Sequence, residues 1–229
     1  MSAPIIIFHH GLLFLGEPPE LCEHAIKIAM EQMQLLKESG LLDAASEMHV
    51  GLNGGQETEF LAQGIFPDKA KITYHGLASR SENLTHVLIE ERMKSLDGEA
   101  YIYYQHQKGS SHAEASSYGQ FATNWRRRMQ HHCVSNWRQC VADLDAGWEA
   151  CGSHWLTGQG HDHSQHYFAG TFYWVKASFF KIIPSIFTRA RIKESGIGAL
   201  ESRYEVEVVL GNGPRLPNVK SYYNGPLGT

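Results

Sequence analysis

Short apolar runs alternate with longer segments that carry one apolar stripe through the first half of the chain. Ile5 to Phe8 form such a run, which two histidines close, and this is typical of a buried strand. The next segment begins with prolines and ends at Gly40, which predicts an amphipathic helix. Both patterns recur, so we expect right-handed βαβ units and a mostly parallel sheet with helices on both faces. The expected strands are Ile5–His10, Glu47–Val50, Lys71–His75 and Ala100–Tyr104, and the expected helices are 18–40, Glu57–Gln63 and Leu84–Leu96.

The second half begins with a long helical pattern and then changes character. From Tyr118 to Leu144, apolar and aromatic residues recur at helical spacing, which predicts a long helix, broken once, with its aromatic side chains in the core. We interpret the glycine- and histidine-rich segment Gly152–Gln165 as a loop. The other expected elements are a strand Tyr167–Val175, a helix Ala177–Ile183 that Pro184 ends, a strand Arg203–Leu210 and an extended tail Gly211–Thr229.

The composition of the chain indicates what class of protein it is and which classes of partner are not expected. With 42% hydrophobic and 19% charged residues over 229 positions, and no long linker, the chain is predicted to form a single globular domain. A net charge of −4 gives no overall attraction to nucleic acid, so we expect no nucleic-acid partner. The four cysteines form no CxxC pair, which favours reduced thiols and a cytoplasmic location. No apolar run approaches the ~20 residues of a membrane helix, so no transmembrane segment is expected.

The end of the strand around Tyr103 switches abruptly from apolar to polar residues. His106, Lys108 and Gly109 follow it, and in doubly wound sheets ligands bind beyond the carboxyl ends of the strands. A lysine there supplies a point charge for a diphosphate, and a glycine lets backbone N–H groups approach it. The alternative is a solvated loop with a turn glycine.

Three histidines and one aspartate lie within six positions of one another in the second half. His161, Asp162, His163 and His166 are residue types that bind Zn²⁺ or Mn²⁺. Neighbouring loop residues cannot all face one ion, and no distant further ligand is evident. A polar loop that binds an acceptor is the preferred interpretation, and a metal-dependent hydrolase is the alternative.

Two glutamates stand two positions apart in the last expected strand. On a strand, Glu205 and Glu207 would project from one face. Their mutual repulsion would raise the pKa of one carboxyl and make it a better proton acceptor near neutral pH. A solvent-facing pair on an edge strand is the alternative.

Taken in order, these segments resemble GT-A glycosyltransferases, and more narrowly a group of bacterial and viral glycosyltransferase-like proteins. That group has a Y-x-H-x-K-G strand end, a W-R-x-x-M helix, an H-F-S-G-N-F-W-W strand and an acidic segment before the preceding helix. Here these pieces read Tyr104-Gln105-His106-Gln107-Lys108-Gly109, Trp125-Arg126-Arg127-Arg128-Met129, His166-Tyr167-Phe168-Ala169-Gly170-Thr171-Phe172-Tyr173-Trp174 and Glu82-Asn83-Leu84-Thr85.

The resemblance implies a single-domain GT-A (Rossmann-like) α/β fold and sugar transfer from a nucleotide-sugar donor to a hydroxyl of a glycan or other acceptor, with inversion. Residues 1–115 would form the donor half, 116–211 the acceptor-side half with a smaller mixed sheet, and 212–229 a C-terminal arm. Glu207 or Glu205 would be the base. His106, Lys108, Gly109 and Arg126 would bind the donor, and His166, Tyr167, Gly170 and Trp174 the acceptor.

The donor side departs from the family pattern in one respect. Most GT-A enzymes hold Mn²⁺ or Mg²⁺ with a D-x-D motif, and Gln105-His106-Gln107 stands in its place. Either His106, with His166 as a second weak candidate, helps to hold a metal, or Lys108 and nearby arginines neutralise the diphosphate without one. The departure also motivates a rival hypothesis, a protein that binds a nucleotide sugar or glycan without turnover.

Overall fold

The computed structural model describes residues 3–13, 19–53, 57–75, 82–159, 165–186 and 204–227, with the side chains of residues 57, 204 and 205 left out. Its first half is a parallel β-sheet with the strand order β3-β2-β1-β4. The predicted alternation of strands and helices is confirmed. The elements are β1 (Ile5–Leu12), α1 (Pro19–Glu38), α2 (Leu41–Ala44), β2 (Ala45–Asn53), α3 (Glu57–Ile65), β3 (Ala70–Tyr74), α4 (Asn83–Lys94) and β4 (Tyr101–His106).

The second half extends the same sheet in a mixed orientation. β8 (Tyr173–Lys176) lies antiparallel to β4 and to β5 (Ala150–Gly152), and β9 (Val219–Ser221) pairs parallel to β5. β6 (Trp155–Gln159) and β7 (Gln165–Phe168) form a separate antiparallel pair. The expected fold class, an α/β protein with a mostly parallel central sheet and a smaller second sheet, is confirmed.

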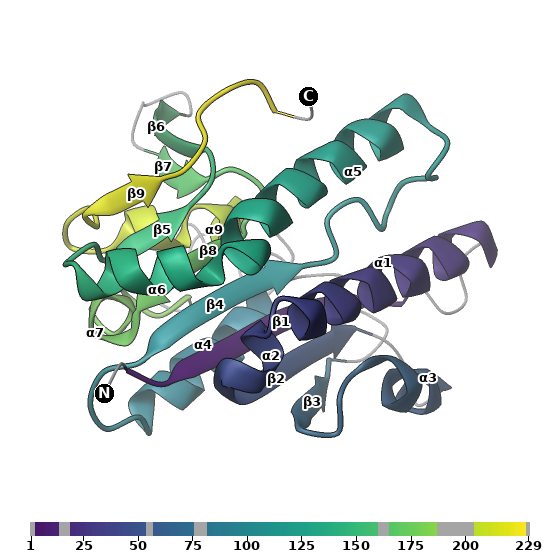
Figure 1. The fold of residues 1–229 in the computed structure, drawn as a ribbon, viewed down its shortest axis with the longest axis horizontal. Coiled ribbons are helices and arrows are strands. Elements are labelled where there is room, and N and C mark those ends of the chain that lie inside the picture. Colours follow the sequence, from purple (N-terminus) through teal and green to yellow (C-terminus); the bar gives the residue numbers. More distant parts are fainter. Residues whose placement is uncertain are drawn as a thin grey trace.

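Helices cover both faces of the seven-stranded sheet. In Figure 1, α1, α2, α5 (Ser117–Gln130) and α6 (Trp137–Asp145) lie in front of the sheet and α4 lies behind it. One core fills the α1 side, where Ile7, Tyr103 and Trp174 meet Met33 and Met129. Because the central strands are buried on both faces, their apolar residues run continuously and do not alternate. The second core, on the α4 side, contains Phe8, Ile89, Tyr104, Phe180 and Val209.

The predicted long helix is present and is broken once, as expected. α5 and α6 are joined by the π-helical turn η1 (His131–Ser135), in which the N–H of Asn136 donates to the carbonyl of His131 over 3.1 Å. The hydroxyl of Ser116 caps the start of α5 by accepting from the N–H of Gly119 over 3.0 Å. Trp125 and Trp137 both pack in the core, as predicted.

Four expected segments in the second half are wrong in their bounds or content. The strand expected over Tyr167–Val175 is interrupted, because Gly170 and Thr171 have positive φ values of +84° and +61° and form a turn between β7 and β8. The expected loop Gly152–Gln165 contains β6, and the expected tail contains β9. The helix after β8 is shorter than expected, ending as α7 (Ala177–Phe180).

The expected strand Arg203–Leu210 is also wrong. Its described part forms the short helix α9 (Tyr204–Glu207) and the 3₁₀ turn η4 (Val209–Asn212). The helical turns place Val206, Val209 and Leu210 in the core on the α4 side. The shared face expected for Glu205 and Glu207 depended on a strand, so the helical backbone removes the basis of that expectation.

Two smaller expectations concern thiols and membranes. All four cysteines are free thiols, which confirms the expected absence of a disulfide framework. Within the described ranges, no helix combines the length and hydrophobicity needed to cross a membrane.

Candidate functional site

Polar side chains gather at the carboxyl ends of β1 and β4, on the face that α4 covers. His10 and His106 are opposite each other in the strand register. Strand alternation places them on the same side as Phe8 and Tyr104. The start of α4 contributes Glu82, the residue at its N-cap, and Thr85. This group is called the strand-end cluster below.

His106 is held between two hydrogen-bond acceptors. Its Nδ1 lies 2.8 Å from Oε1 of Glu82, and its Nε2 lies 2.9 Å from the carbonyl oxygen of Gly170. Since a carboxylate and a carbonyl can only accept, both ring nitrogens carry hydrogen and the ring is an imidazolium. The sequence predicts that His106 lies in the site, and the geometry gives its ring two fixed partners.

Glu82 is the anionic partner in this pair. Burial alone raises the pKa of its carboxyl, but the charge and hydrogen bond of His106 outweigh this effect, and His10 and the Tyr104 hydroxyl add to it. The net pKa is well below its usual range. The hydroxyl of Tyr104 donates to Oε2 of Glu82 over 2.9 Å, so both carboxylate oxygens are engaged and the side chain is ionised.

His10 is the neutral histidine of the cluster. Its Nδ1 lies 2.8 Å from the hydroxyl oxygen of Thr85, and burial lowers its pKa to about 4. Its Nε2 has no hydrogen-bond partner among the described residues, although the side chain is only 3% exposed. Asn53, at the end of β2, is 2% exposed, and both of its amide atoms also lack a described partner. A bound polar ligand would satisfy such groups.

A glycine on β2 makes room for the cluster. A Cβ at Gly51, opposite His10 in the register, would lie 2.0 Å from Oγ1 of Thr85 and 2.5 Å from Nε2 of His75. Any side chain there would displace Thr85 from His10. Gly51 therefore permits α4 to approach the strand ends.

The opposite face of the same strand ends holds a neutral amide network. The Tyr103 hydroxyl donates to Oε1 of Gln105 over 2.9 Å, and the Gln105 amide nitrogen lies 3.1 Å from Nδ1 of His9. The Gln107 amide donates to the carbonyl of Ala25 over 2.6 Å and accepts from the N–H of Leu12. Burial lowers the pKa of His9 to about 3, so this ring is also neutral. The network ties β1, β4 and α1 together.

Lys108 and Gly109 turn away from the end of β4 towards α5. The ammonium of Lys108 lies 4.1 Å from the centre of the Trp125 ring, and Gly109 has a φ of +95°. Arg126 is only 2% exposed, and its guanidinium donates to the carbonyl of Lys108 over 2.8 Å and to Glu31 over 3.3 Å. The expected donor-binding role of Arg126 is therefore corrected: the side chain fixes the Lys108 turn and does not face a ligand.

Gly170 brings a further predicted segment to the same place. A Cβ on it would lie 2.6 Å from Sδ of Met129 and 3.0 Å from Cε2 of Trp125. Its carbonyl accepts the hydrogen bond of His106. The strand end, the α5 helix and the β7–β8 turn, which the sequence singles out separately, thus meet around His106 and Trp125.

The expected acceptor-binding residues are not brought together. Trp174 is fully buried, its ring stacks on Tyr103 with centroids 5.0 Å apart, and its indole N–H donates to the carbonyl of Cys133. It belongs to the core, and its assignment to the acceptor site is wrong. His166 and Tyr167 lie on β7 and are half-buried, and the backbone of His166 packs closely against Gly211.

The predicted base and the histidine cluster are tested only in part. Glu207 is half-buried on α9, and none of its described neighbours forms a hydrogen bond or ion pair with it. The side chain of Glu205 and residues 161–163 lie outside the described part of the chain. Within that part, no group of three or more histidine, cysteine or carboxylate side chains could hold a metal ion.

The end of β4 does not fit the divalent metal that the resemblance implies. A metal ligand needs a free lone pair, and both nitrogens of His106 carry hydrogen. The amide oxygens of Gln105 and Gln107 accept hydrogen bonds from within the fold. These contacts favour the second option, in which the diphosphate is neutralised without a metal, and we derive no step through a metal.

Comparison with known proteins finds similarity only to solved structures, at low sequence identity. No family model matches it, and no curated protein does so either. A 4-diphosphocytidyl-2C-methyl-D-erythritol synthase from Anaerococcus prevotii has a TM-score of 0.46 at 11% identity, over 99% of this chain and 89% of that one. A protein from Desulfovibrio desulfuricans assigned as a nucleotide-diphospho-sugar transferase has a TM-score of 0.47 at 9% identity, over 96% and 80%. A manganese complex of a Mycobacterium tuberculosis protein has a TM-score of 0.46 at 10% identity, over 97% and 89%.

Several residues of the cluster were not singled out by the sequence as site residues. His10, Thr85 and Asn53 come from three elements that only the folded sheet brings together. One signal was present, because the polar pair His9-His10 ends an otherwise apolar strand. The rule that ligands bind at the carboxyl ends of strands applies to β1 as well as to β4.

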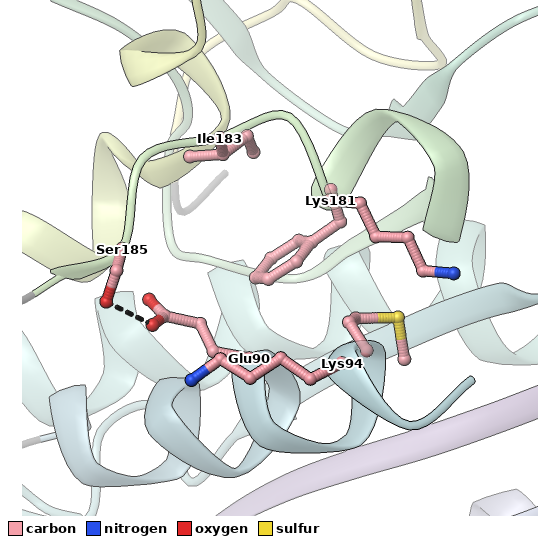
Figure 2. Close-up of a pocket in the computed structure, with 7 residues that line it drawn as sticks. Glu90, Lys94, Lys181, Ile183 and Ser185 are labelled. Atoms are coloured by element: carbon pink, nitrogen blue, oxygen red, sulfur yellow. Dashed lines mark hydrogen bonds between the residues drawn. The ribbon is translucent and has the colours of Figure 1, made fainter.

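A hollow of about 460 Å³ lies at the other end of α4. Figure 2 shows Glu90 and Lys94 from α4 facing Lys181, Ile183 and Ser185. Ser185 donates its hydroxyl hydrogen to Glu90, and the N–H of Ile186 donates to the same carboxylate over 2.7 Å. These bonds anchor the segment after α7 to α4, about two helical turns from the strand-end cluster.

Proposed function

We propose that the protein transfers a sugar from a nucleotide-sugar donor to a hydroxyl acceptor with inversion. One observation carries the proposal: buried polar groups at the carboxyl ends of β1 and β2, Nε2 of His10 and the Asn53 amide, have no partner among the described residues. Ligands of doubly wound sheets bind at this edge, and burial of an unsatisfied polar group costs about 1–3 kcal/mol unless a ligand compensates.

In this proposal the donor diphosphate lies beyond the end of β4. Lys108 supplies positive charge there, while the N–H groups of Lys108 and Ser110 donate within the turn to the carbonyls of His106 and Gln107. The His106 imidazolium and the Glu82 carboxylate neutralise each other, so their contribution is to hold the Gly170 turn in place. The charge that develops on the leaving diphosphate is met by Lys108 without a metal.

The chemical step needs a base on the acceptor side. Glu207, or Glu205, takes the proton of the acceptor hydroxyl as its oxygen forms a bond to the anomeric carbon. The bond from that carbon to the diphosphate oxygen breaks, and the electron pair leaves with the nucleoside diphosphate.

A binding titration tests the donor site. We expect nucleoside diphosphates or their sugars, from a panel of UDP, GDP and CDP forms with and without Mn²⁺, to raise the thermal midpoint. Asn53→Ala should weaken this binding about tenfold, since one hydrogen bond to a charged or polar ligand is lost, and it should leave stability unchanged. Ser46→Ala, at the amino end of β2, is the matched control and should bind normally. If Asn53→Ala binds as tightly as the unaltered protein, the donor does not lie here.

A turnover assay tests the chemistry. Release of nucleoside diphosphate in the presence of sugar acceptors should fall by about 10²-fold or more in either Glu207→Gln or Glu205→Gln. If both variants retain full release, the base assignment is wrong.

The side chains of Gln105, His106 and Gln107 all form hydrogen bonds within the fold. This favours an alternative function, a protein that binds the nucleotide sugar without turnover. Binding of the donor with no release of diphosphate under any acceptor would establish that rival in place of the transferase.

A further inference from the structure

A groove on the solvent side of α5 is unrelated to the strand ends. It is an open groove of about 540 Å³ between α5, the π turn η1 and the C-terminal arm. Its lining residues are mostly basic or histidine, and none of those described is a carboxylate: they are Asn124, Arg127, Arg128, His131, His132 and Tyr223.

Part of the groove is rigid. The guanidinium of Arg128 lies 4.1 Å from the centre of the Tyr223 ring and donates to the carbonyl of Pro226 over 2.9 Å. The His132 ring stacks on Tyr222 and Tyr223 with centroids 6.0 Å and 6.2 Å apart. The C-terminal arm is thereby fixed against the helix, which makes a preorganised wall.

The rest of the groove offers donors to an incoming ligand. Arg127 and His131 are exposed, and Arg127 forms no hydrogen bond or ion pair with another described residue. The π turn places His131 and His132 at the end of α5, and such turns are frequent at functional sites. Arginine, histidine and asparagine side chains converge here from two elements.

The positive groups in the groove repel one another. Burial lowers the pKa of His132, and the charges of His131, His154 and Arg128 lower it further. Burial and Arg128 also lower the pKa of His154, which packs edge-on against Tyr223 with centroids 4.8 Å apart. A bound anion would relieve this repulsion and raise the pKa of His132.

We propose that this groove is a second ligand site, which binds a phosphate group through Arg127, Arg128 and His131. The donors come from two elements, α5 and the π turn, and so approach a ligand from several directions. A phosphate dianion presents oxygens in several directions, whereas a carboxylate presents two oxygens in one plane. The site is independent of the proposed transferase site, because no residue is shared between them.

The test is an NMR titration with inorganic phosphate, in which the ring resonances of the histidines report binding. We expect phosphate to shift the signals of His131 and His132 and to raise the pH at which His132 titrates. Arg127→Gln should weaken this binding about tenfold, the effect of losing one charge-assisted hydrogen bond. Arg138→Gln, an exposed arginine on α6 outside the groove, should bind as the unaltered protein does. Equal thermal midpoints confirm that both variants are folded.

Two further arms identify the source of the phosphate. Glycerol phosphate tests a soluble ligand, and vesicles containing phosphatidic acid, compared with phosphatidylcholine vesicles, test a lipid headgroup. A response in either arm that Arg127→Gln weakens supports the site. The proposal is overturned if phosphate leaves the two histidine signals unmoved, or if Arg127→Gln and the unaltered protein respond equally.

Discussion

The two faces of β1 and β4 differ at their carboxyl ends, although the same strands supply both. On the α1 face, Tyr103, Gln105 and His9 form a chain of neutral hydrogen bonds that joins elements of the fold. On the α4 face, His106 and Glu82 form an ion pair. His9 and His10, one on each face, both keep Nε2 without a described partner. Adjacent residues in the chain thus separate into a structural network and a candidate ligand site, since successive side chains on a strand point to opposite faces.

The largest expected difference between the faces comes from removing one partner on each. Glu82→Leu leaves Nδ1 of His106 and the Tyr104 hydroxyl without an acceptor, and it should lower the free energy of unfolding by roughly 3–5 kcal/mol. Gln105→Leu leaves the neutral groups of Tyr103 and His9 unpaired, which should cost roughly 1–3 kcal/mol. Urea unfolding at neutral pH measures both. A larger loss in Gln105→Leu would show that the neutral face matters more to stability than the ion pair.

Two glycine-to-alanine variants, one on each face, test how much space each face has for an added methyl group. Gly51→Ala places a methyl group against Thr85 and His75 on the α4 face, at 2.0 Å and 2.5 Å from their side-chain atoms, and should destabilise the protein by about 2–3 kcal/mol. Gly11→Ala meets a terminal methyl of Leu52 on the α1 face at 2.8 Å, and that methyl can rotate away, so about 1 kcal/mol is expected. Thermal unfolding distinguishes them, and equal losses would mean that α4 can move to accommodate the alanine.

The smallest expected effect is the pH dependence of stability, to which His9 on one face and His10 on the other contribute in the same direction. The unfolded chain protonates His9 and His10 near pH 6.5, whereas in the folded protein burial lowers their pKa values to about 3 and about 4. Below pH 6.5 the unfolded state therefore binds more protons than the folded state. Stability decreases as the pH is lowered, until the pH reaches the folded pKa. Between pH 7 and pH 5.5 each histidine should account for about 1 kcal/mol of lost stability.

A single variant separates the two histidine contributions. His9→Leu should remove its own share of the pH dependence and keep that of His10, which urea unfolding at the two pH values measures. An unchanged slope would mean that His9 does not titrate in this window.

The parallel half of the fold could be predicted from the sequence because its strands are short apolar runs that turn residues separate. The segment after residue 203 could not. Val206, Val208 and Leu210 alternate as they would on a strand, but packing of Val206, Val209 and Leu210 against the second core makes the segment helical.

The candidate site could be predicted only at the end of β4, where the sequence changes from apolar to polar residues. His106, Lys108 and Gly109 follow an apolar run and do lie at the carboxyl edge. Trp174 was assigned wrongly because the sequence does not show that β8 is central and buried on both faces. The partners of His106 could not be inferred either, since Glu82 and the Gly170 carbonyl reach it only through the folded sheet.

The π turn between α5 and α6 has a consequence for changes in chain length. A π turn contains one residue more than the α turn it replaces, so losing one residue between His131 and Ser135 would leave a continuous α-helix whose two halves still face the sheet. The same deletion inside α5 or α6 would rotate every later side chain by about 100° and pull Trp137 and Leu144 out of the core. Within this pair of helices, the loss of one residue is therefore tolerated best in the π turn, at a position other than the core residues Cys133 and Val134.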